Sequence, residues 1–173
     1  MNLEKIPPYL KENASWCTFR YENRKGNKTK APYNPVTGYK VFVNKPETFT
    51  DFNTAVSALK DYDGLGIRID GIIISIDLDH CIEDGKLNTQ AADIVSHFKN
   101  TYIETSPSGT GLRIILFVAD GYAYDKNTYY IKKGNIEVYV AGATNRFVTI
   151  TGDMYLENKI CENMDSLQWL LNK

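Results

Sequence analysis

The chain has 173 residues, of which 43% are apolar, and a formal net charge of −1. This length predicts a single domain, 1–173, with enough apolar residues to form a core. The near-neutral charge argues against a surface that coats nucleic acid broadly. The sequence has neither an apolar run of membrane-spanning length nor a signal-peptide pattern, so we expect a cytoplasmic protein without a membrane partner. Its three scattered cysteines form no C-x-x-C pair, which indicates neither a disulfide framework nor a structural zinc site.

The charges are unevenly distributed along the chain. Residues 1–50 carry a net charge of +5, whereas residues 51–100 carry −5. A basic N-terminal part beside an acidic middle suits a protein that steers phosphate toward a bound metal. Chance segregation of surface charge explains the same distribution equally well.

The hydrophobic pattern predicts many short strands, few helices and several tight turns. Strands are expected over 16–21, 29–33, 65–69, 72–77, 102–105, 112–118, 129–132, 136–140 and 147–151. Helices are expected over 51–62, capped by Thr50 or Asp51, over 89–98, and over about 164–172, opened by Asp165. The pair Asp70-Gly71 predicts a hairpin between the third and fourth strands. Together these elements favour an α+β fold with a mainly antiparallel sheet and flanking helices over a doubly wound fold.

The clearest functional feature is a pair of acids at the end of an apolar strand. Asp77 and Asp79 follow the run Ile72 to Ile76 and are two residues apart, so both carboxylates would leave the strand on one side. Two unpaired acids would repel each other and lose hydration, and a divalent cation such as Mg²⁺ or Mn²⁺ removes that cost. The alternative is a pair of solvated acids where the strand meets a loop. His80 alternates away from this face and is expected to pack.

A loop rich in Ser and Gly, Ser106-Pro-Ser-Gly-Thr-Gly111, lies between two predicted strands. Its small residues let backbone N–H groups approach an anion, and its hydroxyls add donors, so the loop can cradle a triphosphate. It is not a Walker loop, because the pattern G-x-x-x-x-G-K-[ST] is absent, and a plain turn is the alternative. Arg113 follows on the outgoing strand, where a guanidinium could bind a phosphate.

A third acid and a second arginine follow later in the chain. Glu137 and Tyr139 share one face of the strand at 136–140, and Glu137 is a candidate third metal ligand. Arg146 opens the next strand after a short turn. Neighbouring strands of a hairpin lie ~5 Å apart, so Arg146 and Glu137 can reach one site. An exposed acid and a surface arginine are the alternatives.

In combination these motifs resemble a known family. The runs, in chain order, are I-D-L-D-H-C at 76–81, Y-I-E-T-S-P-S-G-T-G-L-R at 102–113, I-E-V-Y at 136–139 and R-F-V-T-I-T-G at 146–152. They resemble the bifunctional primase–polymerase domain of phage, plasmid and mobile-element replication proteins, in the archaeo-eukaryotic primase superfamily. Trp16, the stretch 30–38 and Gly64-Leu-Gly-Ile also resemble that domain, so the resemblance covers roughly 14–152.

The resemblance implies a sheet related to the RNA-recognition fold and a DNA primase/polymerase that makes and extends primers. Asp77, Asp79 and Glu137 would be catalytic and would hold two Mg²⁺ or Mn²⁺ ions for nucleotidyl transfer. The residues implied to bind the NTP or dNTP are Lys30, Ser106, Ser108, Gly109, Thr110, Gly111, Arg113 and Arg146. Those expected to contact a single-stranded DNA template are Arg24, Lys25 and Lys28, for which a solvated basic turn is the rival interpretation. The sequence has no Walker helicase motif, so a helicase or initiator would act in trans.

The sequence departs from the family pattern at Arg113, where the second motif usually ends in histidine. Arginine can hold phosphate, but it cannot act as a neutral acid or base near pH 7. The alternative function is therefore a non-catalytic, nucleic-acid-binding accessory subunit of a replication initiator or helicase. The intact Asp77, Asp79 and Glu137 argue against it, and a nuclease that uses the same acids is a weaker third possibility.

Overall fold

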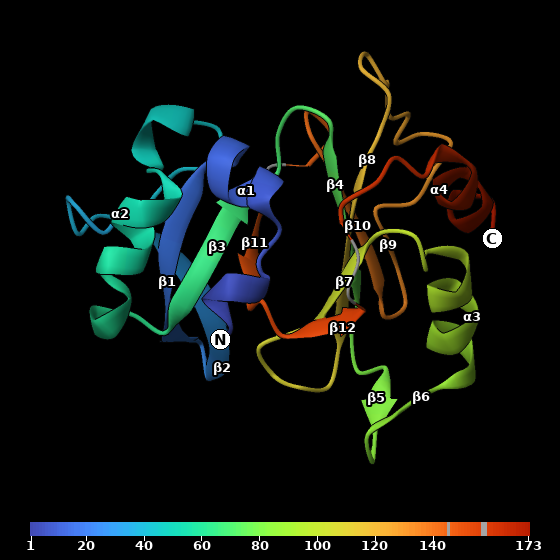
Figure 1. Ribbon diagram of the computed structural model, residues 1–173, viewed down its shortest axis with the longest axis horizontal. Coiled ribbons are helices and arrows are strands. Elements are labelled where there is room, and N and C mark those ends of the chain that lie inside the picture. The colour runs from blue at the N-terminus through green and yellow to red at the C-terminus, as the bar shows by residue number, and fades with distance from the viewer. Residues whose placement is uncertain (145, 157–158) are drawn as a thin grey trace.

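The computed structural model describes residues 1–144, 146–156 and 159–173. The fold is mixed α+β, with two antiparallel sheets side by side and helices on their outer sides (Figure 1). The helices of this part are α1 (Pro8–Asn13), α2 (Phe52–Ser57), α3 (Thr89–His97) and α4 (Met164–Leu171), with 3-10 turns η1 (Leu3–Lys5), η2 (Pro46–Thr48) and η3 (Leu59–Asp61). None of the described helices has the length and apolar character needed to cross a membrane.

The strands form a four-stranded and a six-stranded sheet. The first has the spatial order β11 (Phe147–Ile150), β3 (Gly64–Arg68), β1 (Trp16–Arg24) and β2 (Asn27–Tyr33). The second has the order β12 (Met154–Leu156), β7 (Tyr102–Thr105), β8 (Leu112–Phe117), β4 (Ile73–Leu78), β10 (Ile136–Val140) and β9 (Lys132–Lys133). A separate small hairpin joins β5 (Ile82–Glu83) to β6 (Lys86–Leu87).

The six-stranded sheet is covered on one face by α3 and α4. Ile74, Ile76 and Leu78 of β4 belong to a core cluster that also contains Ile94 of α3 and Leu167 of α4. The helices contact each other where the ring of His97 stacks on Trp169 with 3.6 Å between the ring centroids. Because side chains alternate along a strand, the even-numbered residues of β4 face these helices and the odd-numbered ones face away from them.

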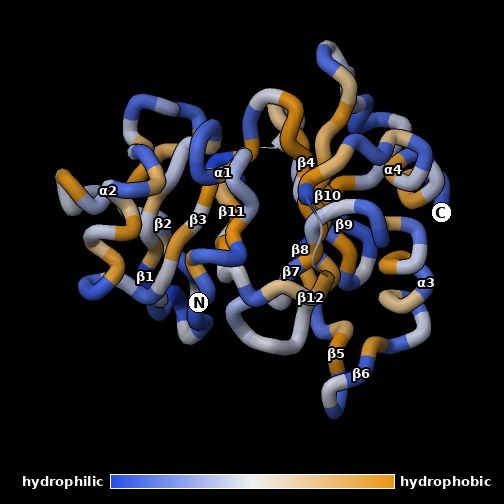
Figure 2. The backbone as a smooth tube through the Cα atoms, viewed as in Figure 1, coloured by the Kyte–Doolittle hydropathy of each residue, from blue (hydrophilic) through white to orange (hydrophobic). Residues whose placement is uncertain are grey.

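The opposite face of the six-stranded sheet packs against the four-stranded sheet. Ile73 and Ile115 share a second core cluster with Leu65, Ile67 and Val148 of the other sheet. Hydrophobic residues accordingly follow the strands of both sheets (Figure 2). Asp77 has the same parity as Ile73, so strand alternation directs it toward the junction between the sheets.

Several elements of the structure differ from those predicted from the sequence. The turn at Asp70-Gly71 exists, with Gly71 at φ +55°, but the predicted hairpin is wrong, because β3 and β4 lie in different sheets. Both edges of β3 are occupied by β1 and β11, and both edges of β4 by β8 and β10, which leaves no edge for the two strands to share.

The predicted helix ends and one predicted strand also differ from the structure. Asp51 caps α2 as expected, but this helix ends at Ser57 and continues as η3. The last helix is capped by Asn163 instead of Asp165, and the strand expected over 129–132 is reduced to β9. The helix expected over 89–98 and the strand over 136–140 are confirmed as α3 and β10.

A buried carboxylate ties β7 to the segment that follows β11. Glu104 is fully buried and accepts hydrogen bonds from the N–H groups of Thr151 at 3.0 Å and Gly152 at 2.9 Å. The Tyr102 hydroxyl donates to the same carboxylate at 2.8 Å. Burial raises the pKa of Glu104, while Arg113 and these donors favour its charged form. All these partners donate, so the site requires a side chain that only accepts.

We expect Glu104→Gln to lower the free energy of unfolding by about 1–3 kcal/mol, because an amide NH₂ would meet backbone donors that it cannot satisfy. Urea denaturation followed by circular dichroism measures the change. The matched control is Glu83→Gln on exposed β5, which should unfold like the wild type. Equal stability of the two variants would contradict the role given to Glu104.

Candidate functional site

Five charged residues form one row across the six-stranded sheet, on the face toward the other sheet. Cross-strand pairing places Glu104 opposite Arg113, Arg113 opposite Asp77, Asp77 opposite Glu137, and Glu137 opposite Lys132. Residues directly opposite each other in antiparallel strands have Cβ atoms about 4.5–5.5 Å apart. The row therefore contains one pair of neighbouring like charges, Asp77 and Glu137, held between two cations.

Each carboxylate of this charged row receives a hydrogen bond from its own strand. The donors are hydroxyls two residues away, on the same face. Tyr102 donates to Glu104 at 2.8 Å, Ser75 donates to Asp77 at 3.3 Å, and Tyr139 donates to Glu137. Burial, and after it the charge of Asp77, raises the pKa of Tyr139, so its hydroxyl stays a donor. These hydroxyls fix the direction in which each carboxylate points.

Arg113 binds Asp77 through two parallel hydrogen bonds. Its Nε donates to Oδ1 at 2.8 Å and its Nη2 donates to Oδ2 at 2.6 Å. Nη1 donates to the Thr149 hydroxyl at 2.7 Å and to the Thr149 carbonyl, across the junction between the sheets. Burial lowers the pKa of Arg113, but Asp77 outweighs this effect and the pKa is raised. Arg113 is therefore a charged link between the two sheets.

This placement differs from two expectations drawn from the sequence. Arg113 is expected to point toward an anion in the loop at Ser106, but its side chain is 5% exposed and faces Asp77 and Thr149. The Asp77 carboxylate lies directly opposite on the next strand, so it is the nearer anionic partner. Asp77 is consequently not the unpaired acid that the strand-end pattern suggests.

Asp79 follows the end of β4 and remains near the other two acids. Partial burial, then the charges of Asp77 and Glu137, raise the pKa of Asp79. Its backbone N–H donates to the Asn135 carbonyl at 2.8 Å, which holds this turn against the start of β10. The two-residue spacing thus brings Asp79 into electrostatic range of the row. The expectation that His80 packs is wrong, because His80 is exposed in a turn at φ +49°.

Glu137 is held by Lys132 and Tyr139, which donate to different oxygens of its carboxylate. Burial raises its pKa, but these hydrogen bonds and the charges of Lys132 and Arg146 leave it lowered. The predicted hairpin between the strands of Glu137 and Arg146 is wrong, because β11 pairs with β3. Arg146 nevertheless lies within electrostatic range of Glu137, as expected.

Lys30 approaches the acids from the four-stranded sheet. It lies on β2 and is half-buried. Burial and the charge of Arg113 lower its pKa, while Asp77 and Asp79 oppose that change. Lys30 and Arg146 are thus cations on the side of the four-stranded sheet, and they face acids of the six-stranded sheet.

The Ser/Gly loop lies directly beside Asp79. A Cβ atom at Gly111 would come 2.8 Å from the Leu78 carbonyl oxygen and 3.6 Å from the Asp79 Cα, so only glycine fits this contact. Within the loop, the hydroxyls of Ser106 and Ser108 are 3.0 Å apart, as are those of Ser108 and Thr110. Gly109 supplies the turn at φ +76°. The structure therefore brings the predicted anion loop to the end of the acid-bearing strand.

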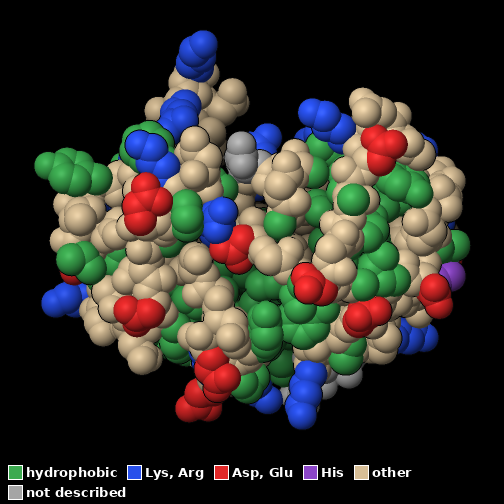
Figure 3. Space-filling view, turned by 90° about the horizontal axis from the view of Figure 1, so that it is seen from above, with side chains coloured by type: hydrophobic (Ala, Val, Ile, Leu, Met, Phe, Trp, Pro, Cys, Tyr) green, Lys and Arg blue, Asp and Glu red, His purple; other side chains and the backbone are tan. Residues whose placement is uncertain are grey.

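Arg24, Lys25 and Lys28 lie apart from the acids, at the exposed tip of the β1–β2 hairpin, where Arg24 ends β1, Lys25 is in the turn and Lys28 is near the start of β2. Arg24 pairs with Glu22 at 3.4 Å, and the Lys28 ammonium is 4.0 Å from the ring centroid of Tyr21. Lys and Arg side chains crowd a projection from this half of the molecule (Figure 3). The same strand β2 connects this basic turn to Lys30.

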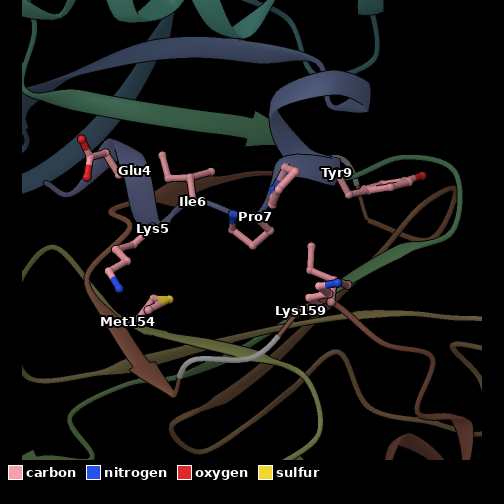
Figure 4. Close-up of a pocket in the computed structure, with 9 residues that line it drawn as sticks. Glu4, Lys5, Ile6, Pro7, Tyr9, Met154 and Lys159 are labelled. Carbon is pink, nitrogen blue, oxygen red and sulfur yellow. The ribbon is translucent and has the colours of Figure 1, made fainter.

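A pocket of about 470 Å³ lies elsewhere, between the N-terminal segment and β12 (Figure 4). Its lining residues are Glu4, Lys5, Ile6, Pro7, Pro8, Tyr9, Met154, Lys159 and Ile160. None of them is a predicted site residue. The chemistry indicated by the sequence therefore gathers at the charged row and not in this pocket.

The three carboxylates suit a divalent cation in their chemistry, but they are not arranged as a preformed metal site. Among the residues that the structure describes, no three Asp, Glu, His or Cys side chains group closely enough to hold a metal ion. Both oxygens of Asp77 bind Arg113, and both oxygens of Glu137 accept from Lys132 and Tyr139. The chain's own cations balance the acids in this arrangement.

Several members of the site do not stand out in the sequence. Lys132 and Thr149 become partners only through strand pairing and sheet packing. Glu104 and the hydroxyl donors carry a weak local signal, since Y-x-E at 102–104, S-x-D at 75–77 and E-x-Y at 137–139 all place a hydroxyl beside an acid on one strand face.

Comparison with known proteins adds a distant relative. The chain is 30% identical over 152 residues to the DNA primase-polymerase of Nitratiruptor phage NrS-1. The alignment covers 84% of this chain and 20% of the phage protein, so the chain spans about a fifth of the length of that relative. No family model matches the chain. The similarity supports the resemblance to primase–polymerases.

We expect Arg113→Met to lower the free energy of unfolding by about 3–5 kcal/mol, because it leaves the buried Asp77 and Glu104 without their cation. Adding Asp77→Asn to this variant should cost less than Asp77→Asn alone, since the second change removes an orphaned charge. Denaturant unfolding of the four proteins in this double-mutant cycle measures the coupling. Arg24→Met, which breaks the exposed pair with Glu22, is the control and should cost about 1 kcal/mol or less. Additive effects of the two buried changes would contradict the pairing.

Proposed function

We propose that the chain is the catalytic module of a DNA primase/polymerase that joins nucleotides into primers and extends them. The observation that carries the proposal is the meeting of three acids with an anion loop and two cations at one junction. Asp77, Asp79 and Glu137 come from the six-stranded sheet and its strand ends, Lys30 comes from the other sheet, and Arg146 comes from the segment just before β11. The distant similarity to a phage primase-polymerase supports the same class of reaction.

In this proposal the incoming NTP or dNTP lies between the two sheets. Lys30 and Arg146 neutralise its phosphates as it approaches the acids, because both cations already lie in electrostatic range of them. The loop from Ser106 to Gly111 contributes backbone N–H groups and hydroxyls for the same anion. Arg113 acts indirectly here, since it holds the Asp77 carboxylate in position.

The metal requirement, Mg²⁺ or Mn²⁺, remains a prediction of this proposal. Of the three acids, Asp79 is the one whose carboxylate accepts no hydrogen bond from a side chain of the charged row in the described part of the chain. Lys132 holds Glu137 as part of the row and would have to yield if that carboxylate turned toward a cation.

The template and its partners complete the proposal. The exposed cations Arg24, Lys25 and Lys28 would contact the phosphates of single-stranded DNA. A helicase or initiator would act in trans during replication of a phage, plasmid or other mobile element.

One observation favours a second function, that of a non-catalytic DNA-binding subunit of such an initiator or helicase. Arg113 occupies both oxygens of Asp77, which an enzyme of this type would need for catalysis. A primer-synthesis assay on single-stranded templates separates the two functions. If the wild type is inert and Arg113→His gains activity, the accessory function is correct and the enzymatic proposal fails.

We expect Asp79→Asn to abolish nucleotide incorporation without lowering stability, because the change removes a carboxylate that is repelled by Asp77 and Glu137. Asp77→Asn should lose activity and stability together, since it breaks the pair with Arg113. Primer synthesis with Mg²⁺ or Mn²⁺, alongside thermal unfolding, measures both properties. Asp84→Asn in the turn between β5 and β6 is the matched control. Full activity of a folded Asp79→Asn protein would refute the site assignment.

Arg146→Ala and Lys30→Ala should each weaken nucleotide binding by about 1.5–3 kcal/mol, the usual worth of a hydrogen bond to a charged group. Binding of single-stranded DNA should change less. Separate titrations of nucleotide and DNA measure this difference, and Lys28→Ala should show the reverse pattern. An Arg146→Ala effect confined to DNA would move Arg146 to the template side.

A further inference from the structure

Two aromatic side chains project into solvent from the segment that follows β2. Tyr39 is 78% exposed and Phe42 is 57% exposed, and Val36 beside them is 72% exposed. Aromatic rings are usually buried, because they carry large apolar areas. Neither ring is needed to fill a core cluster of the described chain. Together with Val36 they form an exposed apolar patch on the segment that follows β2.

A pocket of about 370 Å³ lies at these two rings. It is lined by Asn34, Thr37, Tyr39, Lys40, Phe42, Glu47 and Thr48. This volume falls in the range of pockets that bind small organic groups, about 300–1,000 Å³. The pocket can accept a flat ring between or against the two aromatic side chains.

Hydrogen bonds within the segment hold the pocket in shape. The Asn34 amide oxygen accepts from the N–H groups of Val36 at 2.8 Å and Thr37 at 3.1 Å, and its NH₂ donates to the Thr48 carbonyl at 2.9 Å. The Thr48 hydroxyl donates to the Lys45 carbonyl at 2.7 Å and accepts from the Phe42 N–H at 3.1 Å. These polar groups already hydrogen-bond within the loop, so the ring faces are the main surface left for contact with a ligand. Stacking on ring faces tolerates any base.

The charge around the rings favours a nucleic acid. Residues 22–47 contain six Lys or Arg and two Glu, a net charge of +4. The cations are Arg24, Lys25, Lys28, Lys30, Lys40 and Lys45; Lys40 is paired with Glu22 at 2.7 Å, and Glu47 lines the pocket. The Lys45 ammonium lies 5.6 Å from the Phe42 ring centroid. Alternating cations and exposed rings are the composition of a surface that binds single strands without sequence preference.

Strand β2 connects the aromatic segment to Lys30. Tyr33 at the end of β2 forms a bridge with Lys40, which anchors the aromatic segment to that strand. Lys30, which reaches the acids, is three residues before Tyr33 on β2. At ~3.3 Å per strand residue this separation is about 10 Å. Lys30 and Tyr33 are an odd number of residues apart, so their side chains point to opposite faces of β2, and a DNA strand that contacts both passes around this edge strand of the sheet.

We propose that Tyr39 and Phe42 form a stacking site for unpaired bases of single-stranded DNA, next to the basic strand that leads to the acids. This inference rests on the proposed function, and it adds a DNA contact outside the charged row. The occupant is a base of the template strand, held by its ring face while neighbouring lysines neutralise its phosphates.

The test compares Tyr39→Ala/Phe42→Ala with the wild type in binding a labelled oligodeoxythymidylate, followed by fluorescence anisotropy. We expect affinity to fall about fivefold or more, the effect of losing one stacked base. The slope of affinity against salt should stay unchanged, because no phosphate contact is lost. Lys28→Ala should instead reduce that slope by about one. Tyr155→Ala, which removes a 43% exposed tyrosine from β12, is the matched control and should bind like the wild type.

A second variant tests the contact directly. Tyr39→Trp keeps an exposed ring, and its emission should be quenched when the oligodeoxythymidylate is added. One outcome would overturn the inference: the wild type and the double alanine variant bind the oligonucleotide equally well, and the Tyr39→Trp emission is not quenched. In that case the pocket takes a protein occupant, and the proposed function stands. If the wild type binds no single-stranded DNA, the proposed function fails and this inference fails with it.

Discussion

The bidentate pair between Arg113 and Asp77 is the contact on which the junction of the two sheets depends. Both groups are largely buried, and removing two charges from water is costly unless geometry and hydrogen bonding are good. Here each oxygen of Asp77 has its own guanidinium N–H, and the third nitrogen reaches Thr149 of the other sheet. The pair thus stabilises two charged residues of the six-stranded sheet at the junction, and the bond from Arg113 to Thr149 fixes how β8 faces β11.

The charged row follows from this pair. Once β8 and β4 are in register through Arg113 and Asp77, the neighbouring strands place Glu104 on one side and Glu137 with Lys132 on the other. A slip of one residue would turn these charges toward α3 and α4 and bring apolar residues to the junction. The strand register therefore determines both the packing of the core and the positions of the acids in the row, so these acids cannot be moved without disturbing the core.

The two sheets contribute opposite charges to the junction. The six-stranded sheet carries the acids and keeps them oriented with hydroxyls of its own strands. The four-stranded sheet and the segment before β11 contribute Lys30 and Arg146, and β2 continues from Lys30 to the basic turn and the aromatic segment. An anionic ligand between the sheets would meet cations on one side and an anion loop on the other. In the proposed function, this division of charge suits a nucleotide bound between the sheets.

Local patterns in the sequence determined much of this protein. The alternation and apolar run of β4, the helical spacing of α3, and the turn chemistry at Asp70-Gly71 and in the loop before Gly111 are all properties of neighbouring residues. They predicted the α+β class, most elements, and the gathering of Asp79, Glu137 and the loop. Only the tertiary structure decided that β3 and β4 belong to different sheets, that β11 pairs with β3, that Lys132 faces Glu137, and that Arg113 binds Asp77. Strand pairing and register join residues far apart in the chain, and the most favourable partner of a buried charge depends on which strands become neighbours.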